Sequence, residues 1–161
     1  MFGYTISSDK VDINAPREIV WDILVDLKRY PEWNPFTYRV DSTLRPGDPI
    51  DLYVRMPIRG DRLQTERVKV VNRPTELSWG MKLGFEFLVT TLREQHIEKV
   101  SETSCTYRTW DAFSGLLMPL VMGLFKADVQ NGFNNMTYAL KARAEQIWAE
   151  KQRMDSNARS A

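Results

Sequence analysis

The chain has 161 residues, 43% of them hydrophobic and 27% charged, so its length suits a single compact domain with its own core. Its 22 basic and 21 acidic residues leave a net charge of +1, which attracts nucleic acid only weakly, and we expect no nucleic-acid partner. With one cysteine, Cys105, and one histidine, His96, the chain can form neither an internal disulfide nor a metal site built from thiolates and imidazoles. We therefore expect no metal and no other cofactor.

The start of the chain lacks a basic segment followed by an apolar run. The longest uncharged stretch, residues 112–125, has 14 residues and contains Pro119. A membrane-spanning helix needs about 20 apolar residues. We therefore expect a soluble protein of the reducing cytoplasm with no integral membrane segment. The composition does not indicate an oligomeric state.

Two segments near the start have clear apolar periods. Val11 and Ile13 alternate with polar neighbours, which predicts a short strand. Apolar residues then recur every three or four positions from Ile19 to Leu27, which predicts a short amphipathic helix that ends near Pro31.

The middle of the chain, from residue 36 to residue 113, has an apolar period of about two residues, as strands do. Turn signals occur near Gly47, Gly60, Pro74 and Ser101. This pattern predicts an antiparallel meander with one covered and one wet face.

The last third of the chain has a helical period. After Pro119, apolar residues step by three or four from Val121 to Ile147, which predicts a helix of about 30 residues, on the order of 45 Å long. Such a helix can cover the whole concave face of a sheet. The polar residues 152–161 are expected to form a frayed tail.

Three separated strings carry a family resemblance: VDINAPREIVWDILVDLKRYPEWNPF at residues 11–36, WDAFSGLLMPLV at residues 110–121 and VQNGFNNMTYALKARAE at residues 129–145. They resemble the START-like (SRPBCC) domains of the polyketide cyclase/dehydrase type, over about residues 11–151. The resemblance implies an α+β helix-grip fold, with a curved antiparallel sheet of about seven strands wrapped around a long C-terminal helix. Two short helices would follow the first strand, and residues 1–151 would form one domain.

The resemblance also implies a deep apolar cavity between the sheet and the helix, with access near residues 33–36 and the segment before the helix. The covered strand faces and the helix supply an apolar lining, which predicts a hydrophobic small-molecule ligand. The predicted ligand-contacting residues are Phe36, Tyr38, Leu52, Val54, Met56, Trp79, Met81, His96, Tyr107, Phe113, Leu117, Met118, Phe133 and Met136. Residues 113–125, with two glycines, Pro119 and two methionines, are either a segment that opens to admit the ligand or a buried start of the helix.

Polar candidates for chemistry lie in the last predicted hairpin. If it turns at residues 101–102, His96 lies opposite Tyr107, and both point into the cavity with Asp111. A shift of one residue in register would reverse the faces. An imidazole beside a phenol can exchange protons in a cyclisation or dehydration, so His96, Tyr107 and Asp111 are the catalytic candidates. In the alternative interpretation, the His96–Tyr107 pair is an internal hydrogen bond that orients a ligand.

Three functions remain open from the sequence. The first is binding of a lipid, a polyketide-like aromatic or an isoprenoid in the cavity. The second is a cyclase or dehydratase, a lyase-type enzyme that uses His96 and Tyr107, although no motif requires chemistry. The third is a protein-interaction module whose partner covers the basic strands of residues 53–73, which hold six basic and two acidic residues.

Overall fold

The structure is a computed structural model that describes residues 3–84 and 88–160. The elements in chain order are β1 (Gly3–Ser7), β2 (Val11–Ile13), α1 (Arg17–Val25), the short 3-10 helix η1 (Leu27–Arg29), α2 (Tyr30–Trp33), β3 (Thr37–Ser42), β4 (Pro49–Val54), β5 (Arg62–Asn72), β6 (Glu76–Leu83), β7 (Val89–Ser101), β8 (Ser104–Ser114) and α3 (Met118–Ser160). None of the described helices is both long and apolar enough to span a membrane.

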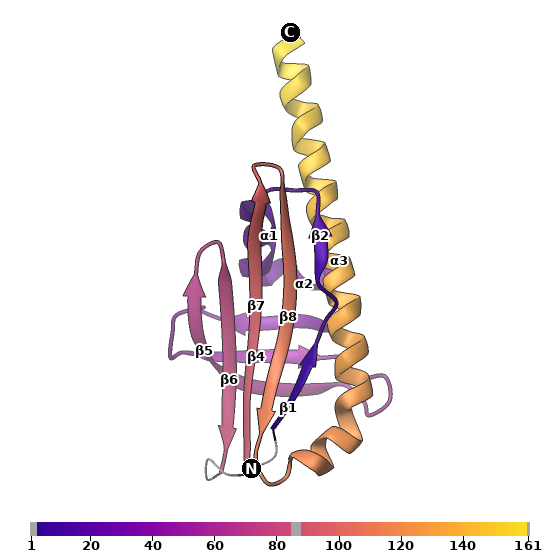
Figure 1. Cartoon of the computed structure of the whole chain (residues 1–161). Coiled ribbons are helices and arrows are strands. Elements are labelled where there is room, and N and C mark those ends of the chain that lie inside the picture. Colours follow the sequence, from indigo (N-terminus) through magenta and orange to yellow (C-terminus); the bar gives the residue numbers. More distant parts are fainter. Residues whose placement is uncertain (1–2, 85–87, 161) are drawn as a thin grey trace.

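All eight strands belong to one antiparallel sheet. Its order is β1-β8-β7-β6-β5-β4-β3, and β2 pairs with β8 next to the part that β1 occupies. The sheet curves strongly, so that β4 runs across the direction of β6, β7 and β8 (Figure 1). Helix α3 lies against the sheet and runs roughly parallel to β7 and β8 (Figure 1). This is the predicted helix-grip fold, with the short helices early in the chain and the long helix at its end.

The strand interiors follow the predicted alternation. Ile50, Leu52 and Val54 of β4 are buried, and Leu77 and Trp79 of β6 are buried as well. Because successive side chains on a strand point to opposite faces, these residues fix which face of the sheet meets α3.

Helix α3 is longer than the sequence pattern predicts. It has 43 residues, and its buried residues run from Met118 to Ala144 at helical spacing, as the apolar period predicts. The residues expected to fray continue the helix as far as Ser160, and every side chain from residue 149 to residue 160 is exposed. This part of α3 projects beyond the sheet (Figure 1).

The β7–β8 hairpin contains a bulge that decides which residues face the helix. Ser101 pairs with Ser104, but the next pair is Lys99 with Cys105, so Val100 is an extra residue on β7. Val100 is 64% exposed. Further along the hairpin, His96 pairs with Arg108 rather than with Tyr107. The predicted register was therefore wrong by one residue, because the turn lies at residues 102–103 rather than 101–102 and the bulge then shifts the pairing back by one.

Candidate functional site

A cavity of about 380 Å³ lies between the sheet and the first turns of α3. We call it the helix–sheet cavity. Its lining is mostly apolar and comes from β5 to β8, the loop after β4, and α3: Met56, Arg62, Leu63, Gln64, Met81, Leu83, Val89, Thr91, Phe113, Met118, Val121, Met122, Phe125 and Val129. It reaches the surface at Leu63 and Leu83, which are 55% and 57% exposed.

Of the predicted ligand-contacting residues, Met56, Met81, Phe113 and Met118 line this cavity. Most of the others fill the core farther along the sheet and α3: Phe36, Leu52, Val54, Trp79, Tyr107, Phe133 and Met136. Tyr38 lies outside the cavity beside Tyr53 and Arg55, and Leu117 is 42% exposed. Contact with a ligand stays a prediction for all of them.

A second row of side chains follows the cavity lining on the same face of the sheet. Met81, Thr91 and Phe113 of the lining pair across β6, β7 and β8. Two residues farther along each strand, Trp79, Arg93 and Asp111 pair in the same way. Since residues two apart share a face, this second row also points toward α3.

Glu66 of β5 joins this row. Gln64, which lines the cavity, donates a hydrogen bond of 2.6 Å from Nε2 to Oε1 of Glu66. Glu66, Arg93 and Asp111 are 4%, 5% and 6% exposed. One basic and two acidic groups are therefore buried together behind an apolar cavity, and we call them the buried charge cluster.

Arg93 has mainly neutral neighbours. Its Nε donates to Thr109 Oγ1 at 3.3 Å, and its Nη2 lies 3.2 Å from Sδ of Met136. Its guanidinium carbon lies 4.2 Å from the ring centre of Phe133 and 5.6 Å from that of Trp79. No ion pair among the described residues includes Arg93. The aromatic rings stabilise the cation in part, but a buried guanidinium usually has a direct anionic partner.

The two acids of the cluster are poor anions. Burial raises the pKa of Glu66 to about 7, although Arg93 and hydrogen bonds from Gln64 and Thr91 act in the opposite direction. Burial also raises the pKa of Asp111 well above its ordinary value, and the nearby Glu66 charge adds to this shift while Arg93 opposes it. Both shifts favour the protonated form, and Glu66 is about half ionised at neutral pH, so the two acids compensate the Arg93 charge less than two ordinary carboxylates would.

Several buried polar atoms around Arg93 have no hydrogen-bond partner among the residues that the structure describes. They are Glu66 Oε2, Trp79 Nε1, Gln95 Nε2 and Asp111 Oδ1. Each such atom costs about 1–3 kcal/mol of stability. Buried polar groups in proteins are normally satisfied, so a local excess of unsatisfied ones suits a region that binds a polar group from outside the chain.

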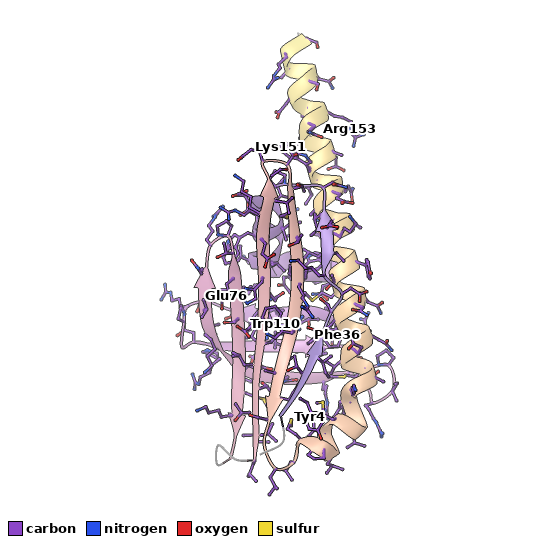
Figure 2. All side chains as sticks on the ribbon, viewed as in Figure 1. Tyr4, Phe36, Glu76, Trp110, Lys151 and Arg153 are labelled. Carbon is purple, nitrogen blue, oxygen red and sulfur yellow. The ribbon has the colours of Figure 1, made fainter. Side chains whose placement is uncertain are left out.

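The predicted pairing of His96 with Tyr107 was wrong. Tyr107 is buried and donates a hydrogen bond of 2.8 Å to Gln95 Oε1. His96 lies on the opposite face of the sheet, where its ring stacks on Trp110 with 4.5 Å between ring centres. Figure 2 labels Trp110 on this sheet. Of the three catalytic candidates, the structure thus brings Tyr107 and Asp111 to the inner face and leaves His96 outside.

His96 does lie near two acids on the outer face. Ligand atoms of Glu76, Glu94 and His96 lie within 4.8 Å of one another. Glu94 also accepts a hydrogen bond of 2.8 Å from Trp110 Nε1. Carboxylates on a partly exposed strand face often gather without an ion, and we assign no metal to this group.

The sequence analysis missed Arg93 and Glu66. A signal for Arg93 was present, because Val89 and Ile97, at the two ends of the same strand, share its odd-numbered face and are buried. When apolar residues on one face of a strand lie both before and after a polar residue on that face, the polar residue is expected to point inward as well. The signal for Glu66 is weaker, because only one apolar residue of its strand, Val68, is buried on the same face.

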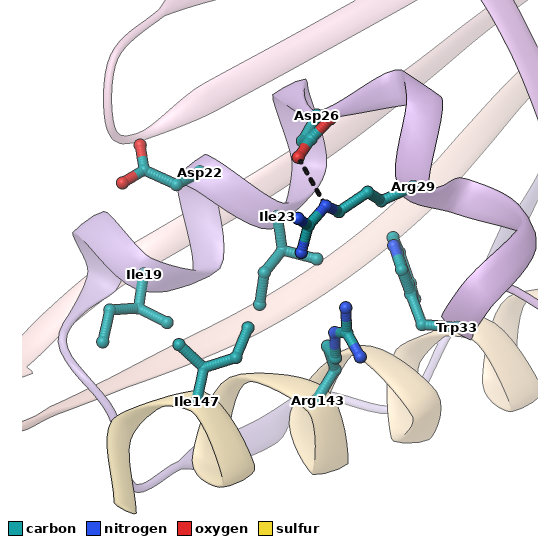
Figure 3. Close-up of a pocket in the computed structure, with 8 residues that line it drawn as sticks. All are labelled: Ile19, Asp22, Ile23, Asp26, Arg29, Trp33, Arg143 and Ile147. Carbon is teal, nitrogen blue, oxygen red and sulfur yellow. Dashed lines mark ion pairs between the residues drawn. The ribbon is translucent and has the colours of Figure 1, made fainter. Parts of the chain in front are cut away.

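A smaller pocket of about 170 Å³ lies elsewhere, between α1, η1, α2 and the later part of α3 (Figure 3). Ile19, Ile23 and Ile147 contribute apolar surface, and Asp26 and Arg29 form an ion pair of 3.6 Å beside them. These charges are largely exposed and already paired. The helix–sheet cavity is larger and adjoins buried groups that lack partners, so we take it as the candidate site.

Comparison with known proteins agrees with this architecture. A protein-family profile described as "Polyketide cyclase / dehydrase and lipid transport" matches residues 5–146. A search of curated protein sequences gave no match.

Solved structures share the fold at low sequence identity. The Zhui aromatase/cyclase from a Streptomyces species has a TM-score of 0.72 at 16% identity, over 90% of this chain and 95% of that one. A START superfamily protein from Mycobacterium smegmatis has a TM-score of 0.66 at 18% identity, over 89% and 98% of the two chains. Norcoclaurine synthase from Thalictrum flavum has a TM-score of 0.67 at 13% identity, over 90% and 96%. With a family match over most of its length and the fold to go with it, the chain belongs to the polyketide cyclase/dehydrase and lipid transport family of START-like (SRPBCC) proteins.

Proposed function

We propose that the helix–sheet cavity binds a hydrophobic small molecule that carries a carboxylate or a carbonyl group. The apolar part would lie against the methionines and Phe113 of the lining. The polar group would approach Arg93 from the cavity side, past Thr91. The observation that carries this proposal is Arg93 itself, a buried cation whose nearest partners are a hydroxyl, a thioether and aromatic rings.

The charge of the cluster favours such a ligand. Because the pKa values of Glu66 and Asp111 are raised, these acids compensate the charge of Arg93 less than ordinary carboxylates would. The protonated acids can also donate hydrogen bonds to a ligand oxygen. A negatively charged or partly negative oxygen would therefore gain a charge-assisted hydrogen bond in surroundings of low dielectric constant.

Binding of decanoate and of decanol, two probes of equal chain length, tests the proposal by calorimetry. Arg93→Met should weaken decanoate binding by at least about 10-fold, the scale of a hydrogen bond to a charged group, and should change decanol binding much less. Arg93→Lys, which keeps the charge, should retain part of the affinity. The matched control is Arg108→Met, because Arg108 is exposed on the outer face of β8. Equal decanoate affinity in wild type and Arg93→Met would reject the proposed role of Arg93.

Native mass spectrometry of freshly purified protein would identify the class of ligand. We expect a co-purifying apolar molecule with a carboxylate or carbonyl group. Extraction of only hydrocarbon-like molecules would contradict the polar part of the proposal.

A second candidate function is acid–base catalysis by Glu66, because its pKa of about 7 suits a group that both takes and gives a proton at neutral pH. Glu66 would remove a proton next to a ligand carbonyl, and the Arg93 cation would stabilise the enolate oxygen that forms. Proton abstraction of this kind begins an aldol cyclisation. This candidate replaces the pair of His96 and Tyr107, which lie on opposite faces of the sheet.

Exchange of the α-protons of 4-phenyl-2-butanone in D₂O, followed by NMR, tests this second function. Catalysis predicts faster exchange with wild-type protein and a loss of about 100-fold or more in Glu66→Gln. The control is Glu94→Gln on the outer face. If wild-type protein does not accelerate exchange of a ketone that it binds, this acid–base function is rejected and the binding function stands.

A further inference from the structure

Exposed apolar side chains lie on the segment of α3 that covers the helix–sheet cavity and just before it. On α3 and just before it, Leu116, Leu117, Leu120 and Leu124 are 62%, 42%, 65% and 39% exposed. Single exposed leucines are common on soluble proteins, but a contiguous group marks an interaction surface. We call these residues, together with the neighbouring side chains described next, the apolar rim.

The first turns of α3 are apolar on both sides. Met118 and Met122 are buried against the sheet, whereas Leu120 and Leu124 point away from it. No charged residue occurs from residue 112 to residue 125. A helix at the surface of a soluble protein normally has a polar outer side, as α3 itself has at residues 149–160, so this segment has an unpartnered apolar side.

The loop between β4 and β5 extends the rim. Arg59 Nε donates a hydrogen bond of 3.3 Å to the carbonyl oxygen of Leu124, and the backbone N–H of Ile58 donates one of 3.2 Å to Asp128 Oδ1. These bonds hold Ile58, which is 64% exposed, beside α3. Leu63 and Leu83 line the cavity and are exposed as well, and we count them as part of the rim.

Basic residues flank the rim. Residues 58–63 and 116–128 contain three basic residues and two acidic ones. One of the acids, Asp128, is buried and accepts the hydrogen bond from Ile58. The guanidinium carbon of Arg62 lies 4.4 Å from the ring centre of Phe125, which places a cation at the edge of the apolar surface. Apolar side chains bordered by cations match the interface of an anionic lipid bilayer.

We propose that the apolar rim docks this protein on the surface of an anionic lipid bilayer, with the cavity opening facing the membrane. The leucines would enter the region between headgroups and acyl chains, and Arg59, Arg62 and Lys126 would contact the headgroups. This inference deepens the proposed function, on which it rests: a hydrophobic ligand would pass between bilayer and cavity without crossing water.

Flotation with vesicles of phosphatidylcholine, with and without 30% phosphatidylglycerol, tests the docking. Wild-type protein should bind the anionic vesicles, bind neutral ones less, and lose binding in 0.5 M NaCl. The variant Leu120→Ser/Leu124→Ser should bind anionic vesicles at least about 10-fold more weakly, because two apolar contacts are removed. The matched control is Val100→Ser/Met154→Ser, which removes side chains that are 64% and 65% exposed far from the rim.

Two outcomes would overturn the docking: wild-type protein that stays unbound with anionic vesicles, and equal vesicle binding by wild type and Leu120→Ser/Leu124→Ser. A third is dimerisation in the absence of lipid, seen by sedimentation velocity and abolished by the same variant, because the rim would then contact a second copy of the chain. Circular dichroism checks that each variant is folded.

Decanoate binding without vesicles separates this inference from the proposed function. A Leu120→Ser/Leu124→Ser protein that keeps decanoate binding but loses vesicle binding supports the docking. Wild-type protein that binds anionic vesicles through the rim but does not bind decanoate would support the docking and contradict the proposed ligand.

Discussion

The Glu66 carboxyl is buried in surroundings that favour its neutral form. Oε1 accepts a hydrogen bond from Gln64, and Oε2 has no hydrogen-bond partner within the described part of the chain. Its pKa is raised to about 7 from an ordinary value of 4.5, chiefly by burial. The folded state therefore holds this proton more tightly than the unfolded state does, which makes the stability of the protein depend on pH.

We expect the free energy of unfolding to fall as the pH rises from about 4.5 to about 7. In this window the carboxyl has lost its proton in the unfolded state but retains it in the folded state. The contribution of Glu66 to stability is therefore complete below its pKa in the unfolded state and disappears as the pH rises through its pKa in the folded state. A shift from 4.5 to about 7 corresponds to roughly 3 kcal/mol. Glu66→Gln should flatten this slope in urea titrations at several pH values. Asp111 contributes a slope of the same sign, so part of it should remain.

The control for this measurement is Glu102→Gln, because the Glu102 side chain is 88% exposed. It should leave the slope unchanged. An equally steep loss of stability in wild type and Glu66→Gln would show that Glu66 is not the responsible group.

The site was harder to predict than the fold because it depends on one residue of register. The alternation in β7 allows either face to be the inner one, and only the extra residue Val100 puts Arg93 inside and His96 outside. A bulge leaves no hydrophobic pattern in the sequence, since its extra side chain is exposed. Tyr107 and Asp111 lie on the inner face together with the apolar residues of their own strand, Cys105 and Phe113, and their contact with a ligand stays a prediction.

At the scale of elements, the environment of α3 changes twice along its length. Its first turns line the cavity, its middle packs on the core, and its last turns contact nothing else in the structure. The middle could be predicted because a buried stripe needs apolar residues at helical spacing. The helical structure of residues 149–160 could not be predicted from a buried stripe, because all of these side chains are exposed. Residues 149–154, Ala-Glu-Lys-Gln-Arg-Met, are nevertheless all strong helix formers, and this signal favours continued helix over fraying.

Two glycines of α3 should respond to alanine in opposite ways. A Cβ atom at Gly132 would lie 2.0 Å from Cδ2 of Phe36, inside the packed core. We expect Gly132→Ala to destabilise the protein by about 1–3 kcal/mol through overpacking. A Cβ at Gly123 would meet nothing within 4 Å, so Gly123→Ala should stabilise by up to about 1 kcal/mol through helix propensity.

Urea unfolding of both variants beside wild type measures this contrast. If both variants change the free energy of unfolding by the same amount and in the same direction, helix propensity alone determines the effect and the Phe36 ring moves aside without cost. A Gly132→Ala/Phe36→Leu double variant should recover part of the lost stability, because leucine is smaller than the phenylalanine ring.

At the scale of the whole molecule, the first turns of α3, which line the cavity, lie at one end and its exposed last turns at the other (Figure 1). If the cavity binds a ligand as proposed, any widening of its opening would occur at this end. Residues 113–125 cover the cavity there through Met118, Met122 and Phe125, with exposed leucines between them. They have fewer buried contacts than the middle of α3, so we expect lower local stability.

Hydrogen exchange should detect this difference. The amides of residues 116–125 should exchange faster than those of residues 129–140 and should slow when decanoate is added. Equal protection of the two segments, unchanged by ligand, would place the route of access elsewhere.

The long α3 also makes the rotational diffusion of this protein anisotropic. At about 1.5 Å per residue, its 43 residues span about 64 Å, longer than the sheet that it lies against. Backbone N–H bonds lie along the axis of a helix but across the direction of a strand, and β7 and β8 run roughly along α3 (Figure 1). The amide bonds of residues 129–148 therefore reorient mainly by slow end-over-end tumbling. Their ¹⁵N R2/R1 ratios should exceed those of β7 and β8, and equal ratios would mean that the distal turns are too mobile to add to the length of the rotating body.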